Sequence, residues 1–152
     1  IQHELLEGTV QSAVHVDAST AYLGASQEEA EKRGHREQVT YLYGNFVELA
    51  PEIAPADVVT LDRVLCCYPD MPALVAATAS HARHLLGVIY PRDAWWTRVG
   101  GRAENLWFWL GRNRFRIFVH PATAVDAAIR ASGFSPRFQK NSGIWQVVLY
   151  GR

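Results

Sequence analysis

The chain contains few cysteines, no excess of either charge and no long apolar run. Its two cysteines, Cys66 and Cys67, are adjacent, and consecutive cysteines rarely form a disulfide because their Cα atoms lie too close together. No cluster of histidine and cysteine at ligand spacing surrounds them, so the sequence predicts neither a zinc site nor another bound metal. Unpaired thiols are typical of a reducing compartment, and we expect a cytoplasmic protein.

Neither sign of charge is in excess, because 15 Lys and Arg residues balance 15 Asp and Glu residues. A neutral chain offers no general electrostatic attraction for nucleic acid, which argues against nucleic acid as a partner. The apolar runs are too short for a membrane span, and the N-terminus lacks the order of charged, apolar and small residues that marks a signal peptide. The sequence therefore predicts no membrane span.

Strand-like and helix-like segments alternate along the chain, which is long enough for one domain with a buried core. Apolar runs at 13–16, 39–43, 57–61 and 85–90 predict strands, and segments 1–6, 20–33, 72–84 and 120–131 predict helices. Such alternation predicts an α/β fold with a parallel sheet between two layers of helices, in three α/β/α layers.

The end of the chain departs from this alternation. Strand-like runs at 134–140 and 144–150 are separated only by Asn141, Ser142 and Gly143. This connection is too short for a crossover helix, so we predict an antiparallel hairpin. The expected sheet is therefore mostly parallel with a terminal antiparallel strand.

Two predicted strands end in an acidic residue just before a helix-like segment, at Asp17 and at Asp62. A carboxylate at the C-terminal end of a parallel strand is where open α/β sheets hold the ribose of a nucleotide-like ligand, since it accepts from both vicinal hydroxyls. For Asp17 the alternative is a helix N-cap, a position that both Asp and Ser suit.

The sequence resembles the class I S-adenosylmethionine-dependent methyltransferases in four places. They are VDAS around Asp17, GNF at Gly44–Phe46, DVVTLDRVLCCYPD at 57–70, and the terminal SGF…SGIWQVVLYGR hairpin. Segment 57–70 and HPATAVDAAIRASGF are similar to small-molecule methyltransferases of the magnesium-protoporphyrin type. The resemblance implies a Rossmann-like methyltransferase sheet, S-adenosyl-L-methionine as cofactor, and direct in-line methyl transfer to a small-molecule acceptor.

The chain departs from the family pattern at its start. The glycine-rich D/E-x-G-x-G-x-G turn of the family is absent, and Ile1 lies within a predicted helix. We expect the first strand and this turn to precede Ile1, so that residues 1–152 form a single, N-terminally truncated methyltransferase-like domain. The 152-residue chain alone is then expected to be inactive and to bind the cofactor weakly; micromolar binding would contradict this.

The resemblance also implies which residues bind the cofactor. Asp17 would bind the ribose, Asn45 the adenine amino group and Phe46 the adenine ring. Asp62 and Arg63 would lie near the methionine portion and the reactive methyl group. The full set of expected cofactor-binding residues is Asp17, Ala18, Ser19, Gly44, Asn45, Phe46, Asp62 and Arg63. An ordinary Gly44–Asn45 turn and an Asp62–Arg63 surface pair remain the alternatives.

Residues 92–116 are aromatic and basic, with six arginines against two acidic residues and four of the five tryptophans. Arginine beside aromatic surface suits a flat, anionic, aromatic acceptor. We expect residues 92–118 to form a cap insertion, and the acceptor to contact Tyr68, Trp95, Trp96, Trp107 and Trp109. The same composition suits a homodimer interface or a plain core helix with a solvated basic face.

The sequence shows no nucleophile, metal site or catalytic triad, which fits a reaction whose activated group is carried by the cofactor. His120, just before Pro121, is the one candidate for a general base, with helix capping and packing as its alternative roles. Two other classes of protein stay open. They are a nicotinamide-dependent oxidoreductase, which predicts an all-parallel sheet, and a non-catalytic Rossmann-like domain used for protein association.

Overall fold

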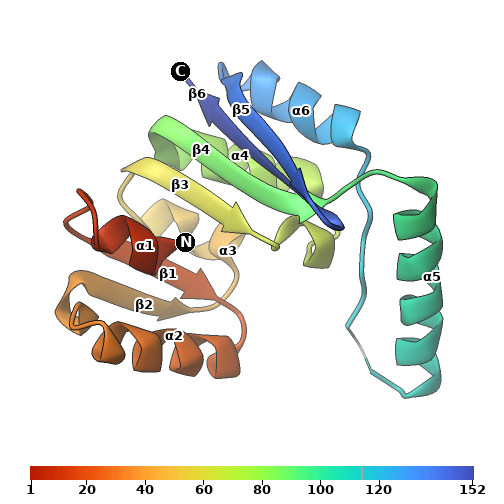
Figure 1. Cartoon of the computed structure of the whole chain (residues 1–152), viewed down its shortest axis with the longest axis horizontal. Helices are drawn as coiled ribbons and strands as arrows, with labels where there is room; N and C mark the ends of the chain where they lie inside the picture. Colours follow the sequence, from red (N-terminus) through yellow and green to blue (C-terminus); the bar gives the residue numbers. More distant parts are fainter. Residues whose placement is uncertain (114) are drawn as a thin grey trace. The chain divides into compact units, whose positions relative to one another are not determined.

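The computed structural model describes residues 1–113 and 115–152, which form two compact units, Ile1–Ile53 and Ala54–Arg152 (Figure 1). Arg114, one of the arginines of the aromatic and basic segment, lies outside the described residues. A single methyltransferase-like domain over 1–152, with a cap at 92–118, stays a prediction.

In the first unit a helix connects two parallel strands. β1 (Ala13–Asp17) pairs with β2 (Val39–Tyr43) from one end to the other, so that Asp17 lies opposite Tyr43. The connecting helix α2 (Thr20–Lys32) begins at Ser19, whose hydroxyl oxygen accepts a hydrogen bond from the Tyr22 amide. The remaining elements of this unit are α1 (Gln2–Leu6), η1 (Arg36–Gln38), α3 (Phe46–Leu49) and η2 (Ala50–Glu52).

In the second unit four strands form a mixed sheet in the order β3-β4-β6-β5. β3 (Ala56–Asp62) and β4 (Ala82–Pro91) are parallel. β6 (Trp145–Gly151) is antiparallel both to β4 and to β5 (Ser135–Ser142). The prediction of parallel pairing with a terminal antiparallel strand is confirmed, and the hairpin turn is shortened to two residues, Gly143 and Ile144.

Two helices cover one face of this sheet, α4 (Met71–His81) and α6 (Ala122–Ala131) (Figure 1). The core residues of these helices and of β4 are fully buried, among them Leu74, Val75, Leu86, Val125 and Ile129. Burying each such side chain stabilises the fold by roughly 1.5–3 kcal/mol before the entropy of ordering it is counted. The packed helices therefore fix the position of the strand ends and of the turns that follow them.

The boundary between α4 and β4 differs from the sequence prediction. The helix predicted over 72–84 ends at His81, and the strand predicted over 85–90 begins at Ala82. Ala82 is buried and pairs with Ala56, while Arg83 and His84 are exposed beside the Asp57 carboxylate. Polar residues thus occupy the start of a strand whose pairing, rather than its own sequence pattern, fixes its conformation.

Helix α5 (Trp95–Leu110) forms most of the aromatic and basic segment. Thr97 caps its start, since its hydroxyl accepts a hydrogen bond from the Ala94 amide at 3.1 Å. After the helix, residues 115–121 run back along it; we call this segment the strap. Among the described residues no helix is long and apolar enough to cross a membrane.

Candidate functional site

In the first unit the turns that follow β1 and β2 lie next to each other. The parallel register places Asp17 opposite Tyr43, and the Gly44 amide donates to the Asp17 carbonyl at 3.1 Å. The Asp17 carboxylate accepts from the Ser19 amide through Oδ1 at 2.7 Å. This bond uses one of about four acceptor positions of a carboxylate, so Asp17 both shapes the turn and keeps the capacity to accept from a diol.

The Gly44–Asn45–Phe46 turn has a backbone conformation that requires glycine at its first position. Gly44 has φ +147°, and a Cβ atom there would lie 2.9 Å from Leu49 Cδ1, so a side chain would disturb the turn. Asn45 caps α3, because its Oδ1 accepts from the Val47 amide at 3.1 Å while its Nδ2 donates to Glu48. The amide of Asn45 is thus oriented by the helix that it begins.

In the second unit a tight turn follows β3. The Arg63 amide donates to the Ile89 carbonyl of β4 at 2.9 Å, which continues the ladder one residue past Asp62. Arg63 has φ +59°, a left-handed conformation uncommon outside glycine. Its Nε lies 3.1 Å from Asp62 Oδ1, and its guanidinium lies over the Trp145 ring at 5.8 Å. The Asp62–Arg63 pair is therefore present, at the carboxyl end of a parallel strand.

His120, in the strap, contacts the turn that follows Arg63. The Phe118 amide donates to the Cys66 carbonyl at 2.8 Å, which ties the strap to this turn. His120 Nε2 lies 2.9 Å from the Tyr68 carbonyl oxygen, and its ring stacks on Phe118. A carbonyl only accepts, so Nε2 carries the proton and Nδ1 is the nitrogen left to accept one.

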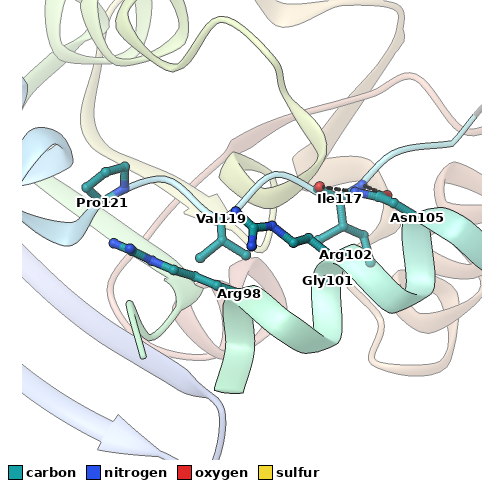
Figure 2. Close-up of a pocket in the computed structure, with 7 residues that line it drawn as sticks. All are labelled: Arg98, Gly101, Arg102, Asn105, Ile117, Val119 and Pro121. Carbon is teal, nitrogen blue, oxygen red and sulfur yellow. Dashed lines mark hydrogen bonds between the residues drawn. The ribbon is translucent and has the colours of Figure 1, made fainter. Parts of the chain in front are cut away.

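A groove runs between α5 and the strap (Figure 2). It has a volume of about 340 Å³ and is lined by Arg98, Gly101, Arg102, Asn105, Ile117, Val119 and Pro121. Asn105 fixes the strap with two hydrogen bonds of 2.7 Å, one to the Ile117 carbonyl and one from its amide. Figure 2 shows the side chains of Arg98 and Arg102 extending along the groove toward Val119 and Pro121. The groove therefore combines two guanidinium groups with apolar walls.

The structure separates the predicted site residues into three groups. Those at 17–19 and 44–46 adjoin one another in the first unit. In the second unit Asp62, Arg63 and Tyr68 occupy the turns after β3, and His120 of the strap contacts the Tyr68 carbonyl. The four tryptophans of α5 are exposed, and Trp107 lines a second hollow on the same helix. Convergence of all predicted site residues on one ligand stays a prediction.

The sequence analysis did not identify Arg98, Arg102 and Asn105 as groove residues. Their spacing of three and four positions puts them on one edge of a helix, and Gly101 between them leaves room for the strap. This spacing could have predicted that the three side chains share one side of the helix. What the sequence lacked was a sign that residues 115–121 return along this edge.

The cysteine pair is reduced and shows no metal-binding geometry. Cys66 and Cys67 are free thiols with their sulfur atoms 3.7 Å apart, and Cys66 donates to the Arg63 carbonyl at 3.1 Å. The hydrogen bond with Cys67 and burial raise the pKa of the Cys66 thiol well above its usual range. Among residues 1–113 and 115–152, no group of three or more histidine, cysteine or acidic side chains is arranged to hold a metal ion.

No protein-family model matches the chain, and no curated protein sequence matches it. Solved structures do share its fold. Magnesium protoporphyrin IX methyltransferase from Synechocystis PCC 6803, solved with bound SAH, aligns with a TM-score of 0.71 and 18% identity over 93% of this chain and 64% of that one. An O-methyltransferase family protein from Burkholderia thailandensis aligns with a TM-score of 0.72 and 16% identity, over 93% of this chain and 43% of the other.

A third solved structure is an O-methyltransferase family 2 protein from Planctomyces limnophilus in complex with apigenin. It aligns with a TM-score of 0.70 and 18% identity over 97% of this chain and 44% of that one. The chain thus spans 43 to 64% of the length of these three proteins. At these identities the likeness shows the fold, and it confirms the predicted Rossmann-like methyltransferase fold.

Proposed function

We propose that the chain carries the adenosine-binding and acceptor-binding parts of an S-adenosyl-L-methionine-dependent methyltransferase. The observation that carries the proposal is the pair of adjoining turns at the carboxyl ends of β1 and β2, with the Asp17 carboxylate in one and Gly44 and Asn45 in the other. Carboxyl ends of parallel strands are where open α/β sheets bind nucleotide-like ligands. The methyltransferase fold of the chain supports the choice of cofactor.

The residues of these turns fit an adenosine. Asp17 has acceptor positions for the two ribose hydroxyls. Asn45, whose amide is oriented by its bonds with Val47 and Glu48, is proposed at the adenine edge because an amide both donates and accepts. Gly44 allows the turn between them, because a Cβ atom there would lie 2.9 Å from Leu49 Cδ1. The sequence resemblance adds Ala18, Ser19 and Phe46 to the proposed adenosine-binding residues. It also proposes Asp62 and Arg63, in the second unit, as residues that bind the methionine portion.

The cofactor, when bound, supplies a methyl group activated for direct in-line displacement, so the protein's main task is to align the acceptor. We propose that His120 Nδ1 accepts the proton that the methyl acceptor loses, because Nε2 already donates to the Tyr68 carbonyl. That hydrogen bond fixes both the ring orientation and the tautomer. His120 thereby acts as a general base for an oxygen or nitrogen acceptor.

The acceptor is proposed to be a small anionic aromatic molecule. Arg98 and Arg102 supply positive charge to the groove on α5, and Ile117 and Val119 supply apolar walls. Tyr68 and the tryptophans Trp95, Trp96, Trp107 and Trp109 are the further aromatic residues proposed to contact it. Free thiols are consistent with the reducing conditions of the cytoplasm, the proposed location.

The test is a titration of the isotope-labelled 152-residue chain with S-adenosylhomocysteine, followed by NMR. We expect the amide signals of 17–19 and 44–46 to shift first, with a dissociation constant above the micromolar range. Asp17→Ala should abolish these shifts. Asp70→Ala, which removes a carboxylate elsewhere at a helix start, serves as the control and should preserve them.

Two outcomes would contradict the proposal. One is the absence of any shift at millimolar ligand, and the other is a stronger response to a nicotinamide dinucleotide than to S-adenosylhomocysteine. The antiparallel strand β6 already disagrees with the all-parallel sheet expected of a nicotinamide-dependent oxidoreductase. Methyl transfer is therefore the function that the geometry supports best.

A further inference from the structure

The two arginines of the groove on α5 differ in their partners. Arg98 Nε donates to Asp93 Oδ1 at 2.6 Å, and the Asp93 side chain is only 19% exposed, so solvent screens this ion pair incompletely. Among the residues that the structure describes, no carboxylate pairs with Arg102. The positive charge of Arg98 is therefore largely offset within the protein, whereas that of Arg102 is not.

The two sides of the strap make different contacts. Ile117, Val119 and Pro121 line the groove on α5 (Figure 2). Phe118 and His120 alternate with them and contact the turn that follows β3, through the Phe118 amide and His120 Nε2. The groove and the His120 ring therefore lie on opposite sides of the strap.

The groove is bounded at one end and leads to the end of the strap at the other. Asn105 joins α5 to the strap through two hydrogen bonds and bounds the groove there. Pro121, the last residue of the strap, lines the opposite end. Arg102 lies four residues, or about 6 Å along the helix axis, nearer to Asn105 than Arg98 does. A molecule bound to Arg102 can therefore extend past Arg98 toward Pro121.

We propose that the methyl acceptor is an aromatic acid with a single negative group, that Arg102 binds this group, and that a hydroxyl or amine at the far end of the molecule receives the methyl. This inference rests on the proposed function. The strap separates an anion at Arg102 from His120, the proposed base, so the anion serves recognition only. The acceptor oxygen or nitrogen bonds the methyl carbon with its own electron pair, the electrons of the broken carbon–sulfur bond stay on sulfur, and the proton passes to His120.

The size of the groove supports a small acid with one charge. Its volume of about 340 Å³ lies near the lower end of the roughly 300–1,000 Å³ that ligand pockets occupy, which is enough for one or two rings. A second carboxylate on so small a molecule would lie near Arg98, whose charge Asp93 already offsets. We therefore expect the groove to prefer a monocarboxylate to a dicarboxylate of the same ring.

The test is a titration of the isotope-labelled 152-residue chain with para-hydroxybenzoate, followed by NMR. We expect the signals of α5 and the strap to shift with a dissociation constant in the millimolar range, as suits so small a ligand. Arg102→Gln should raise this constant about fivefold or more, because it removes a charge-assisted hydrogen bond. Arg112→Gln, the same change at an exposed arginine beyond the end of α5, is the matched control and should leave it unchanged.

Two variants test whether Asp93 offsets the charge of Arg98. The double variant Asp93→Asn with Arg98→Gln removes the ion pair without changing the net charge, and it should change the constant for para-hydroxybenzoate less than about twofold. Asp93→Asn alone keeps an acceptor oxygen for Arg98 but removes the negative charge. Terephthalate should then bind about fivefold more tightly than para-hydroxybenzoate, compared with at most about twofold in the wild-type chain.

The orientation of the ligand is measured by intermolecular NOEs. The ring protons beside the hydroxyl should contact Pro121, and contacts of these protons with Asn105 instead would overturn the proposal. An Arg102→Gln chain that binds as tightly as the wild type overturns it as well, and so does a preference of the wild-type chain for terephthalate beyond the factor above. A failed titration with S-adenosylhomocysteine, read at 17–19 and 44–46 in the other unit, would contradict methyl transfer and leave the anion site at Arg102 in place.

Discussion

The two neighbouring thiols differ sharply although they share one acceptor, the Arg63 carbonyl. Cys66 is buried with its sulfur 3.1 Å from that oxygen, whereas Cys67 is exposed at 3.8 Å. Only a thiolate is nucleophilic, so a thiol that is both buried and held protonated reacts slowly. The turn after β3 therefore contains one accessible thiol and one shielded thiol.

We predict that iodoacetamide modifies the folded chain once, at Cys67, and that Cys66 reacts at least about tenfold more slowly, because its hydrogen bond with Cys67 and its burial raise its pKa. Intact mass followed by peptide mapping measures both rates. In urea the two thiols should react alike, which serves as the control. Equal rates in the folded protein would show that the hydrogen bond and the burial of Cys66 do not protect it.

At the scale of residues, the sequence predicted where a residue lies along a strand or turn better than it predicted which residues it contacts. The acid–helix pattern predicted that Asp17 follows a strand, and the structure adds that one of its oxygens already serves the turn through Ser19. The Asp62–Arg63 pair was equally visible in the sequence. The Arg63–Trp145 contact joins residues 82 positions apart, and no local pattern encodes a contact of that range.

At the scale of elements, α4 begins with a strong capping arrangement. The Asp70 carboxylate accepts from the Ala73 amide at 3.0 Å, and Pro72 occupies the first turn, where its missing N–H is not needed. Asp70 also places a negative charge at the positive end of the helix dipole. This arrangement fixes where the turn containing Cys66, Cys67 and Tyr68 ends.

We predict that Asp70→Ala lowers the free energy of unfolding of the second unit by about 1 kcal/mol, the usual value of an N-cap. Asp70→Ser keeps a capping oxygen and should cost only a few tenths of that. Urea unfolding followed by tryptophan fluorescence measures both, because all five tryptophans lie in this unit. Equal losses for the two variants would assign the effect to charge instead of capping.

Helices and strands with a strong apolar pattern were predictable to within a few residues, as β2 (Val39–Tyr43) illustrates. The short helices α3 and η3 (Leu65–Cys67) were not, since four or three residues carry too little pattern to predict. The early start of β4 was also missed, because Ala82 is a strand residue only through its pairing with Ala56. Pairing between strands is a tertiary effect that the local sequence does not contain.

At the scale of the whole molecule, three of the six histidines lie close together in the first unit. His3 and His35 share a hydrogen bond of 2.8 Å between ring nitrogens, and His15 bonds Gln2 at 2.7 Å. Burial lowers the pKa of both His3 and His15, and for His3 the neighbouring His35 and Arg33 lower it further. The nearby Glu29 and Asp17 act in the opposite direction without cancelling these effects.

The first unit should therefore lose stability in mild acid. A histidine whose pKa is lower in the folded state binds more protons when unfolded, so stability is full above the ordinary pKa of 6.5 and falls as pH drops below it. We predict a lower urea midpoint at about pH 5.5 than at about pH 7.5, read from the NMR signals of β1 and β2. His15→Gln should weaken this dependence.

His84→Gln provides the matched control, because His84 is an exposed histidine in the second unit. It should leave the pH dependence of the first unit unchanged. An unchanged midpoint in the wild-type chain between these two pH values would mean that the histidines titrate alike in the folded and unfolded states.

Strand β5 has a consequence for how the protein behaves at high concentration. It ends the sheet order β3-β4-β6-β5, and all eight of its residues are exposed. Within this strand Pro136 offers no amide to an incoming chain, while Arg137 and Lys140 repel a copy of themselves. Edge-to-edge aggregation is therefore disfavoured along this side of the molecule, even though the strand has half of its backbone groups turned toward solvent.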